Sequence, residues 1–188
     1  MKSQITMKKS VVLTGTTPIM FDRYSGNNKT ELRPLEKVYT DEEGYLVLPS
    51  LNILSFLSAT NTESAPKRVI GRGYKEVAKA ALSFVTIEPF NIPFLVNGKK
   101  ITLETADIDI HFAVARVMKG PLAVPNPKER PLLNLPWDLE FQISLIETPE
   151  LGEQLLQKLF EIGGLAIGFG TFRGVFGKFK IVKWDNVK

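Results

Sequence analysis

Hydrophobic and polar residues alternate along three stretches of the chain, a pattern typical of half-buried strands. The stretches cover residues 5–13, 108–118 and 137–145, and the last has large apolar residues at every second position. Because successive side chains of a strand point to opposite faces, each predicted strand has one face toward a core and one toward water. Lys9 is the single residue that breaks the alternation in the first stretch.

Helical signals occupy three other segments. Apolar spacing and capping residues predict helices over 51–58 and 74–82. A threonine, a proline and an acid open a third predicted helix over 149–162, where leucines line one side. We expect Gly163 and Gly164 to end this helix, because glycine is the usual residue after a helix C-terminus.

The remaining segments are short strands, turns and loops. Turn residues at 41–44 and at Asn97-Gly98 predict two hairpins, the second through a type I′ turn. Five prolines lie between residues 121 and 136. Because proline lacks the N–H that a sheet interior needs, residues 119–136 are predicted to form a protruding loop or arm. Further strands are expected near residues 84–88 and 175–184.

The order of these elements predicts the fold class. A strand–helix–strand unit at each end of the chain indicates an α+β fold with a ferredoxin-like (βαββαβ) antiparallel sheet, into which hairpins and the Pro-rich arm are inserted. We expect a single domain over residues 1–188, with insertions at about 22–48, 59–72 and 119–136.

Composition narrows the classes of function. The chain has 188 residues, a formal net charge of +4 and no cysteine. The absence of cysteine excludes disulfides, thiolate metal sites and cysteine nucleophiles. No apolar run approaches the ~18 residues that would span a bilayer, and the first residues lack a signal-peptide core. We therefore expect a cytoplasmic protein without a membrane segment, and the sequence indicates no metal site and no cofactor.

The segment 163–184 is the strongest functional signal. It holds six of the 14 glycines, four phenylalanines, four basic residues and no acidic residue. Glycine lets a backbone approach a partner closely, while cations beside aromatic rings can neutralise phosphates and stack on bases. The segment therefore predicts contact with a polyanion. The alternative is that the glycines serve tight helix-to-strand packing and the phenylalanines fill the core.

A second basic group lies on the predicted loop and helix at 67–79, where a solvated surface is the alternative interpretation. The arm adds Lys119, Lys128 and Arg130 as weaker candidates. The residues predicted to bind nucleic acid are the following: Lys67, Arg68, Arg72, Lys75, Phe169, Phe172, Arg173, Lys178 and Lys180.

Two residues are candidates for catalysis. Asp22 lies in the loop after the first strand, where a carboxylate could orient a 2′-hydroxyl for RNA cleavage, or could form a local turn hydrogen bond. His111, the only histidine, shares a predicted strand face with Asp107 and Asp109, which suggests either acid–base chemistry or a polar solvent-facing edge.

The glycines at 168, 170, 174 and 177, preceded by the predicted helix 149–162, resemble the glycine-rich loop of the RAMP superfamily. These proteins are RNA-binding subunits of CRISPR effector complexes and often polymerise along the RNA. The arm at 119–136 resembles the thumb-like insertion of the backbone subunits. Asp22 matches loosely the loop aspartate that some of them use to cleave RNA, whereas the histidine of the family's processing nucleases has no matching position.

The resemblance implies a non-catalytic subunit that binds single-stranded RNA or DNA, RNA favoured, and that forms a homo-oligomer or part of a ribonucleoprotein complex. One alternative is a metal-independent ribonuclease of the same superfamily that uses Asp22 or His111. Another is a structural or inhibitory protein of a phage or mobile element that oligomerises or docks on a protein partner.

Overall fold

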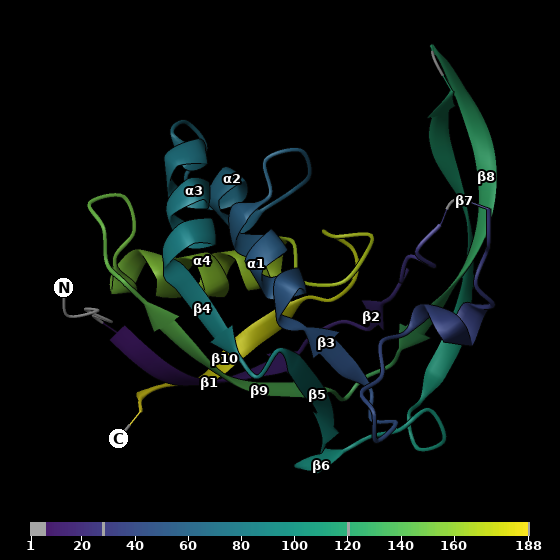
Figure 1. Cartoon of the computed structure of the whole chain (residues 1–188), viewed down its shortest axis with the longest axis horizontal. Coiled ribbons are helices and arrows are strands. Elements are labelled where there is room, and N and C mark those ends of the chain that lie inside the picture. Colours follow the sequence, from purple (N-terminus) through teal and green to yellow (C-terminus); the bar gives the residue numbers. More distant parts are fainter. Residues whose placement is uncertain (1–6, 28, 120, 188) are drawn as a thin grey trace.

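The structure, a computed structural model, describes residues 7–27, 29–119 and 121–187. Four helices cover one face of a twisted sheet, and a long two-stranded hairpin projects beside them (Figure 1). The strands are β1 (Met7–Gly15), β2 (Ile19–Met20), β3 (Val47–Pro49), β4 (Val85–Glu88), β5 (Asn91–Val96), β6 (Lys99–Lys100), β7 (Ile108–Lys119), β8 (Leu122–Leu133), β9 (Asp138–Leu145) and β10 (Phe179–Asn186). The helices are the 3₁₀ helix η1 (Pro34–Lys37) and the α-helices α1 (Ser50–Ser58), α2 (Ala65–Val69), α3 (Tyr74–Phe84) and α4 (Glu153–Ala166).

The main sheet has the strand order of a ferredoxin-like fold. β10, β1, β9 and β4 are neighbours in that order, and each pair is antiparallel. The helices α1 to α3 connect β1 to β4, and α4 connects β9 to β10, which is the βαββαβ sequence of elements. β5 pairs with β9 beyond the end of β4, and β3 and β6 flank β5. The predicted α+β antiparallel fold is therefore confirmed.

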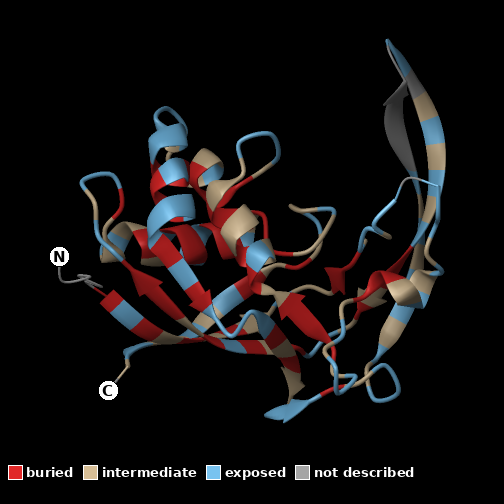
Figure 2. Cartoon of the chain, viewed as in Figure 1, coloured by how far each residue is buried: buried red, intermediate tan, exposed pale blue. Residues whose placement is uncertain are grey.

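The core lies between this sheet and the helices. The odd-numbered positions of β1 and β9 are buried and their even-numbered neighbours are more exposed, as the alternation predicts (Figure 2). Lys9 breaks the pattern because its ammonium lies 2.6 Å from the Glu153 carboxylate at the start of α4. The buried cation therefore has a charge partner, which a buried charge requires. Residues 5 and 6 of the first predicted strand lie outside the described residues.

Gly163 and Gly164 do not end the last helix, contrary to prediction. α4 continues through them to Ala166. A Cβ on Gly163 would lie 2.7 Å from both Phe56 and Ala65, and a Cβ on Gly164 would lie 2.6 Å from the Phe179 ring. The two glycines are therefore helical residues over which α1, α2 and β10 pack closely.

The Pro-rich segment protrudes as predicted, but it is a strand and not a loop. β8 pairs with β7 along its whole length and with β2 only at residues 132 and 133. The carbonyl of Pro131 accepts a hydrogen bond from Phe21 N–H on the side away from β7. Pro125 and Pro127 have the same parity, so their nitrogens face the unpaired edge, where a strand tolerates proline. We call β7 and β8 the hairpin arm.

Other local predictions shift in detail. The predicted insertion 59–72 contains the short helix α2, and the predicted insertion 22–48 contains the 3₁₀ helix η1. α4 begins at Glu153, because Thr148 forms a turn with Leu151 instead of capping the helix. Asn97 and Gly98 both have positive φ, which confirms the predicted type I′ turn between β5 and β6.

Candidate nucleic-acid interface

The glycine-rich loop, residues 167–178, connects α4 to β10 and is held by backbone contacts. Gly168 and Gly177 both have positive φ, and a Cβ on either would collide with the backbone of the opposite limb of the loop. Gly170 N–H donates to the Asn52 side chain of α1, at 3.0 Å. Gly177 N–H donates to the Pro18 carbonyl, at 2.7 Å. These contacts fix the loop against the segment that follows β1.

Phe169 belongs to the core and not to an interface. Its side chain is fully buried, and its ring stacks on Phe179 with centroids 4.3 Å apart. The Phe56 ring of α1 packs on it edge-on at 5.0 Å. The prediction that Phe169 stacks on a base is corrected, because the ring has no face toward water.

Phe172, in contrast, lies at the surface of the same loop. It has positive φ and its side chain is half exposed. Its ring centroid lies 6.3 Å from that of Phe176, which in turn lies 5.5 Å from the His111 ring on β7. The three rings form a continuous aromatic group that joins the glycine-rich loop to the hairpin arm. Flat rings at a surface are the groups on which nucleic-acid bases stack.

Arg173 connects the loop to the helical layer. Its guanidinium donates to the Glu63 carbonyl at 2.9 Å and to the Ser55 hydroxyl at 3.1 Å. Partial burial lowers the pKa of Arg173, since desolvation disfavours the charged form. Both acceptors are neutral, and no carboxylate of the described residues forms an ion pair with this guanidinium. The side chain is thus a partly desolvated cation without a negative partner.

The second basic group surrounds the turn between α2 and α3. Arg72 and Lys75 are exposed, and neither forms an ion pair within the described part of the chain. Arg68 pairs with the Glu63 carboxylate at 3.1 Å, and Lys67 is partly exposed on the same short helix. Because the Glu63 carbonyl also accepts from Arg173, one residue connects this basic turn to the glycine-rich loop.

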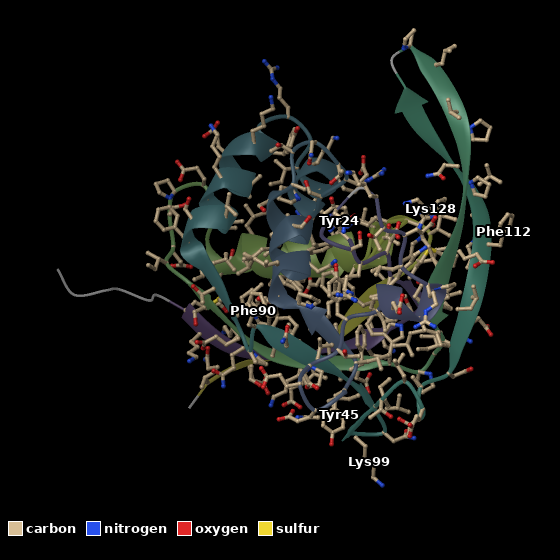
Figure 3. All side chains as sticks on the ribbon, turned by 45° about the vertical axis from the view of Figure 1, so that its right-hand side comes forward. Tyr24, Tyr45, Phe90, Lys99, Phe112 and Lys128 are labelled. Carbon is tan, nitrogen blue, oxygen red and sulfur yellow. The ribbon has the colours of Figure 1, made fainter. Side chains whose placement is uncertain are left out.

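The hairpin arm supplies a third basic group on its inner side. His111 and Arg130 are cross-strand neighbours in β7 and β8, and Lys128 has the parity of Arg130. Figure 3 shows Lys128 on the side of the arm toward the body of the molecule, whereas Phe112 points away from it. The Phe176–His111 contact therefore brings the glycine-rich loop beside these cations.

The structure thus places three predicted groups in one chain of contacts. The basic turn at 67–75 contacts Arg173 through Glu63, and the aromatic rings at 172 and 176 contact His111 beside Arg130. Basic residues lie at both ends of this path, and the rings of Phe172, Phe176 and His111 lie between them. We call it the basic–aromatic track.

Lys180 does not join Arg173. Phe179 points toward the helices, so Lys180, the next residue of β10, is exposed on the opposite face of the sheet. The backbone N–H of Lys178 donates to the Thr17 hydroxyl, at 2.9 Å. We place Lys180 outside the track, because the sheet separates it from the glycine-rich loop.

The two candidates for catalysis are both engaged. The Asp22 carboxylate accepts from Arg130 Nε at 2.9 Å and lies 3.4 Å from Lys128 Nζ. The His111 ring packs on Phe176, while Asp109 accepts from the Asn134 amide at 2.9 Å instead of contacting the histidine. Among the described residues, no group of three His, Cys, Asp or Glu side chains could hold a metal ion.

Sequence reasoning did not identify Phe176 and Lys37 as residues that contact the hairpin arm. Phe176 alternates with Lys178 and Lys180 in sequence, which places it on their strand face, but the residue precedes β10 and turns toward the arm. Lys37 is nearly buried, and its ammonium donates to the Glu129 carbonyl of β8 at 2.7 Å. No local pattern marks this contact, because it depends on how η1 packs against the arm.

No family model matches this sequence, and no curated protein matches it. One similar solved structure is a chain of the cryo-EM structure of the Type III-B Cmr-beta bound to cognate target RNA. The identity is 14%, the TM-score is 0.47, and the match covers 96% of this chain and 61% of that chain. The protein therefore spans about three fifths of the length of this neighbour. A likeness this distant does not place the chain in a family.

Within the described residues, no helix is both long enough and apolar enough to cross a bilayer.

Proposed function

We propose that the protein is a non-catalytic cytoplasmic subunit that binds single-stranded nucleic acid along the basic–aromatic track. One observation carries the proposal: Arg173, a cation without a negative partner among the described residues, lies beside the exposed ring of Phe172 and the partly buried ring of Phe176, between two further basic groups. Phosphates would contact Arg173, Arg72 and Lys75, and bases would stack on the ring of Phe172. RNA is favoured over DNA because the glycine-rich loop resembles that of the RAMP superfamily.

The track suits a single strand better than a duplex. Exposed rings can stack only on bases that are not covered by a neighbouring base pair, and every base offers such a face. A surface of this kind binds without strong sequence preference, and most of its affinity depends on salt. The acids near the track, Glu63 and Asp22, already hold cations of this chain, so they repel a phosphate less than unpaired acids would.

The test is binding of a labelled, unstructured RNA 20-mer measured by fluorescence anisotropy across a salt series. If about four phosphates are contacted, log K falls with log salt at a slope of about −3. The double variant Arg72→Gln with Lys75→Gln removes two exposed cations and makes the slope shallower by about 1.4. Lys180→Gln, on the far face of the sheet, is the matched control for loss of one charge. A slope near zero for the unmodified protein rejects the proposal.

The same RNA tests the absence of catalysis. Incubation in chelator is expected to leave the labelled strand intact, because Asp22 is held by two cations and His111 packs on an aromatic ring. Cleavage that disappears in Asp22→Ala or His111→Ala establishes the ribonuclease alternative instead. Light scattering with and without RNA then measures whether copies assemble along the strand.

A further inference from the structure

Asp22 lies at the junction between the loop 22–33 and the hairpin arm. The N–H of Phe21 donates to the Pro131 carbonyl, which places the next residue directly beside β8. The Asp22 carboxylate then contacts the side chains of Arg130 and Lys128, at 2.9 and 3.4 Å. Its side chain is only one fifth exposed. The contact is therefore built into the fold and is not a chance pairing of surface charges.

Positive charge exceeds negative charge at this junction. The Arg130 side chain is 8% exposed, and its Nη1 is buried without a hydrogen-bond partner among the described residues. The Lys37 side chain is 5% exposed and faces one carboxylate, that of Glu31, which is 74% exposed and 3.6 Å away. Asp22 is thus the one largely buried acid that contacts Arg130 and Lys128 in the described part of the chain. A buried cation with an unused donor favours a further anion.

An open pocket of about 710 Å³ is lined by Asp22, Lys37 and Lys128, and Arg130, which is not part of the lining, is connected to it through its ion pair with Asp22. Its charged lining consists of the cations Arg23, Lys29, Lys37 and Lys128 and the acids Asp22 and Glu31. A pocket of this size and charge accommodates a nucleotide with its phosphate.

We infer that Lys128 and Arg130 form a site for a backbone phosphate of the bound nucleic acid, and that Asp22 occupies this site as an internal anion that weakens binding. The inference rests on the proposed function and extends it to the arm. A phosphate that enters must displace the carboxylate from the two cations. Asp22 therefore opposes nucleic-acid binding, and its removal is expected to increase affinity, which is the reverse of what loss of a catalytic group does.

Asp22→Asn tests this directly, because the amide keeps the size of the side chain and an oxygen acceptor for Arg130 while it removes the charge. The variant is expected to bind the RNA 20-mer about tenfold more tightly at low salt, as one recovered charge-assisted contact predicts. Its salt slope steepens by about 0.7 for each phosphate gained. Adding Lys128→Met to Asp22→Asn abolishes the gain, since one of the two cations is then missing.

Asp185→Asn is the matched control, because it removes the same charge from an exposed position of β10, a main-sheet strand outside the arm. Its affinity is expected to change by less than about twofold. Thermal melting establishes that each variant is folded, and Asp22→Ser replaces Asp22→Asn if the latter is not. Unchanged or weaker RNA binding by a folded Asp22 variant overturns the inference and leaves the proposed function intact.

Inorganic phosphate tests the anion site without RNA. It is expected to raise the melting temperature of Asp22→Asn more than that of the unmodified protein, because ligand that binds only the folded state stabilises it. If RNA binds no variant, the proposed function fails, and the phosphate measurement alone decides the anion site. Equal response of the two proteins to phosphate then rejects that site as well.

Discussion

The sheet with its helices and the hairpin arm are stabilised in opposite ways. In the sheet and helices, rings from four elements pack together without exposure, and these are Phe56, Phe160, Phe169 and Phe179. In the arm, Ile110, Phe112 and Val114 are each about half exposed on one face of β7, and charged residues lie on the other. Figure 2 shows the same contrast in the distribution of buried residues.

This difference separates the buried residues that stabilise the fold from the residues that are available to contact a ligand. Burial of apolar area depends less on salt than ion pairs do, and at the base of the arm the pair of Lys37 with the exposed Glu31 is screened more than the largely buried pair of Arg130 with Asp22. The body is therefore expected to keep its stability over a salt range in which the arm and its ligand contacts weaken. The predictions below test this division from the largest expected effect to the smallest.

Phe169→Ala is expected to lower the free energy of unfolding by about 4 kcal/mol, because it opens a cavity among buried rings. Phe172→Ala removes the same ring from the exposed part of the same loop and is expected to cost less than about 0.5 kcal/mol. Urea unfolding measures both. Equal losses would contradict the assignment of one ring to the core and the other to the surface.

Gly177→Ala is expected to destabilise the protein by about 3 kcal/mol, since the added Cβ meets the Phe169 backbone and the residue has positive φ. Gly174→Ala separates the two causes. Gly174 also has positive φ, but its Cβ would approach only the Ala166 carbonyl, at 3.9 Å. A cost of about 1 kcal/mol is expected for it. Similar urea midpoints for the two variants would show that the loop backbone shifts to accommodate the Cβ at position 177 at little cost.

Phe172→Ala is expected to weaken RNA binding about tenfold through the loss of one stacked base, which is worth about 1–3 kcal/mol. Val175→Ala is the control, because Val175 is similarly exposed in the same loop and lacks a ring. Anisotropy at fixed salt compares the two. A larger loss in Val175→Ala would point to apolar burial in place of stacking.

Arg173→Ala is expected to have a modest effect on the fold, about 1 kcal/mol, because hydrogen bonds to Glu63 and Ser55 are lost while the cost of desolvating a cation is relieved. RNA binding at low salt falls in parallel, and Arg173→Lys does not restore the two-point attachment. Unfolding and anisotropy on the same samples measure both effects. A more stable Arg173→Ala protein with unchanged RNA binding would exclude the residue from the track.

Local pattern was sufficient to predict most of the main sheet. The alternation in β1 and β9, and the Asn97-Gly98 turn, depend on neighbouring residues in sequence, so they could be read directly. The helical glycines could not, because their role depends on Phe56 and Phe179, which are distant in sequence. The prediction for 119–136 was right about a protruding arm but wrong about a loop, because the missing proline N–H excludes a sheet interior and not the outer edge of a two-stranded hairpin.

The sequence indicated which residue types a nucleic-acid site would use, but not how those residues are arranged in space. Residue types indicated Arg173 and Phe172, but they did not separate Phe172 from the buried Phe169, because both lie in a loop to which strand alternation does not apply. The ion pairs between Asp22 and the arm join residues more than 100 positions apart, at 106 and 108. Contacts at such separation depend on the folded topology, so the role of Asp22 emerges only from the structure.

The prolines of β8 have one more consequence. A long two-stranded ribbon that extends from a protein offers its outer backbone as a template on which strands of other molecules can add, and such addition leads to aggregates. Pro125 and Pro127 remove two hydrogen-bond donors from that border. That border of β8 is therefore a poorer template for a further strand, and contacts on this side of the ribbon depend more on side chains than on backbone.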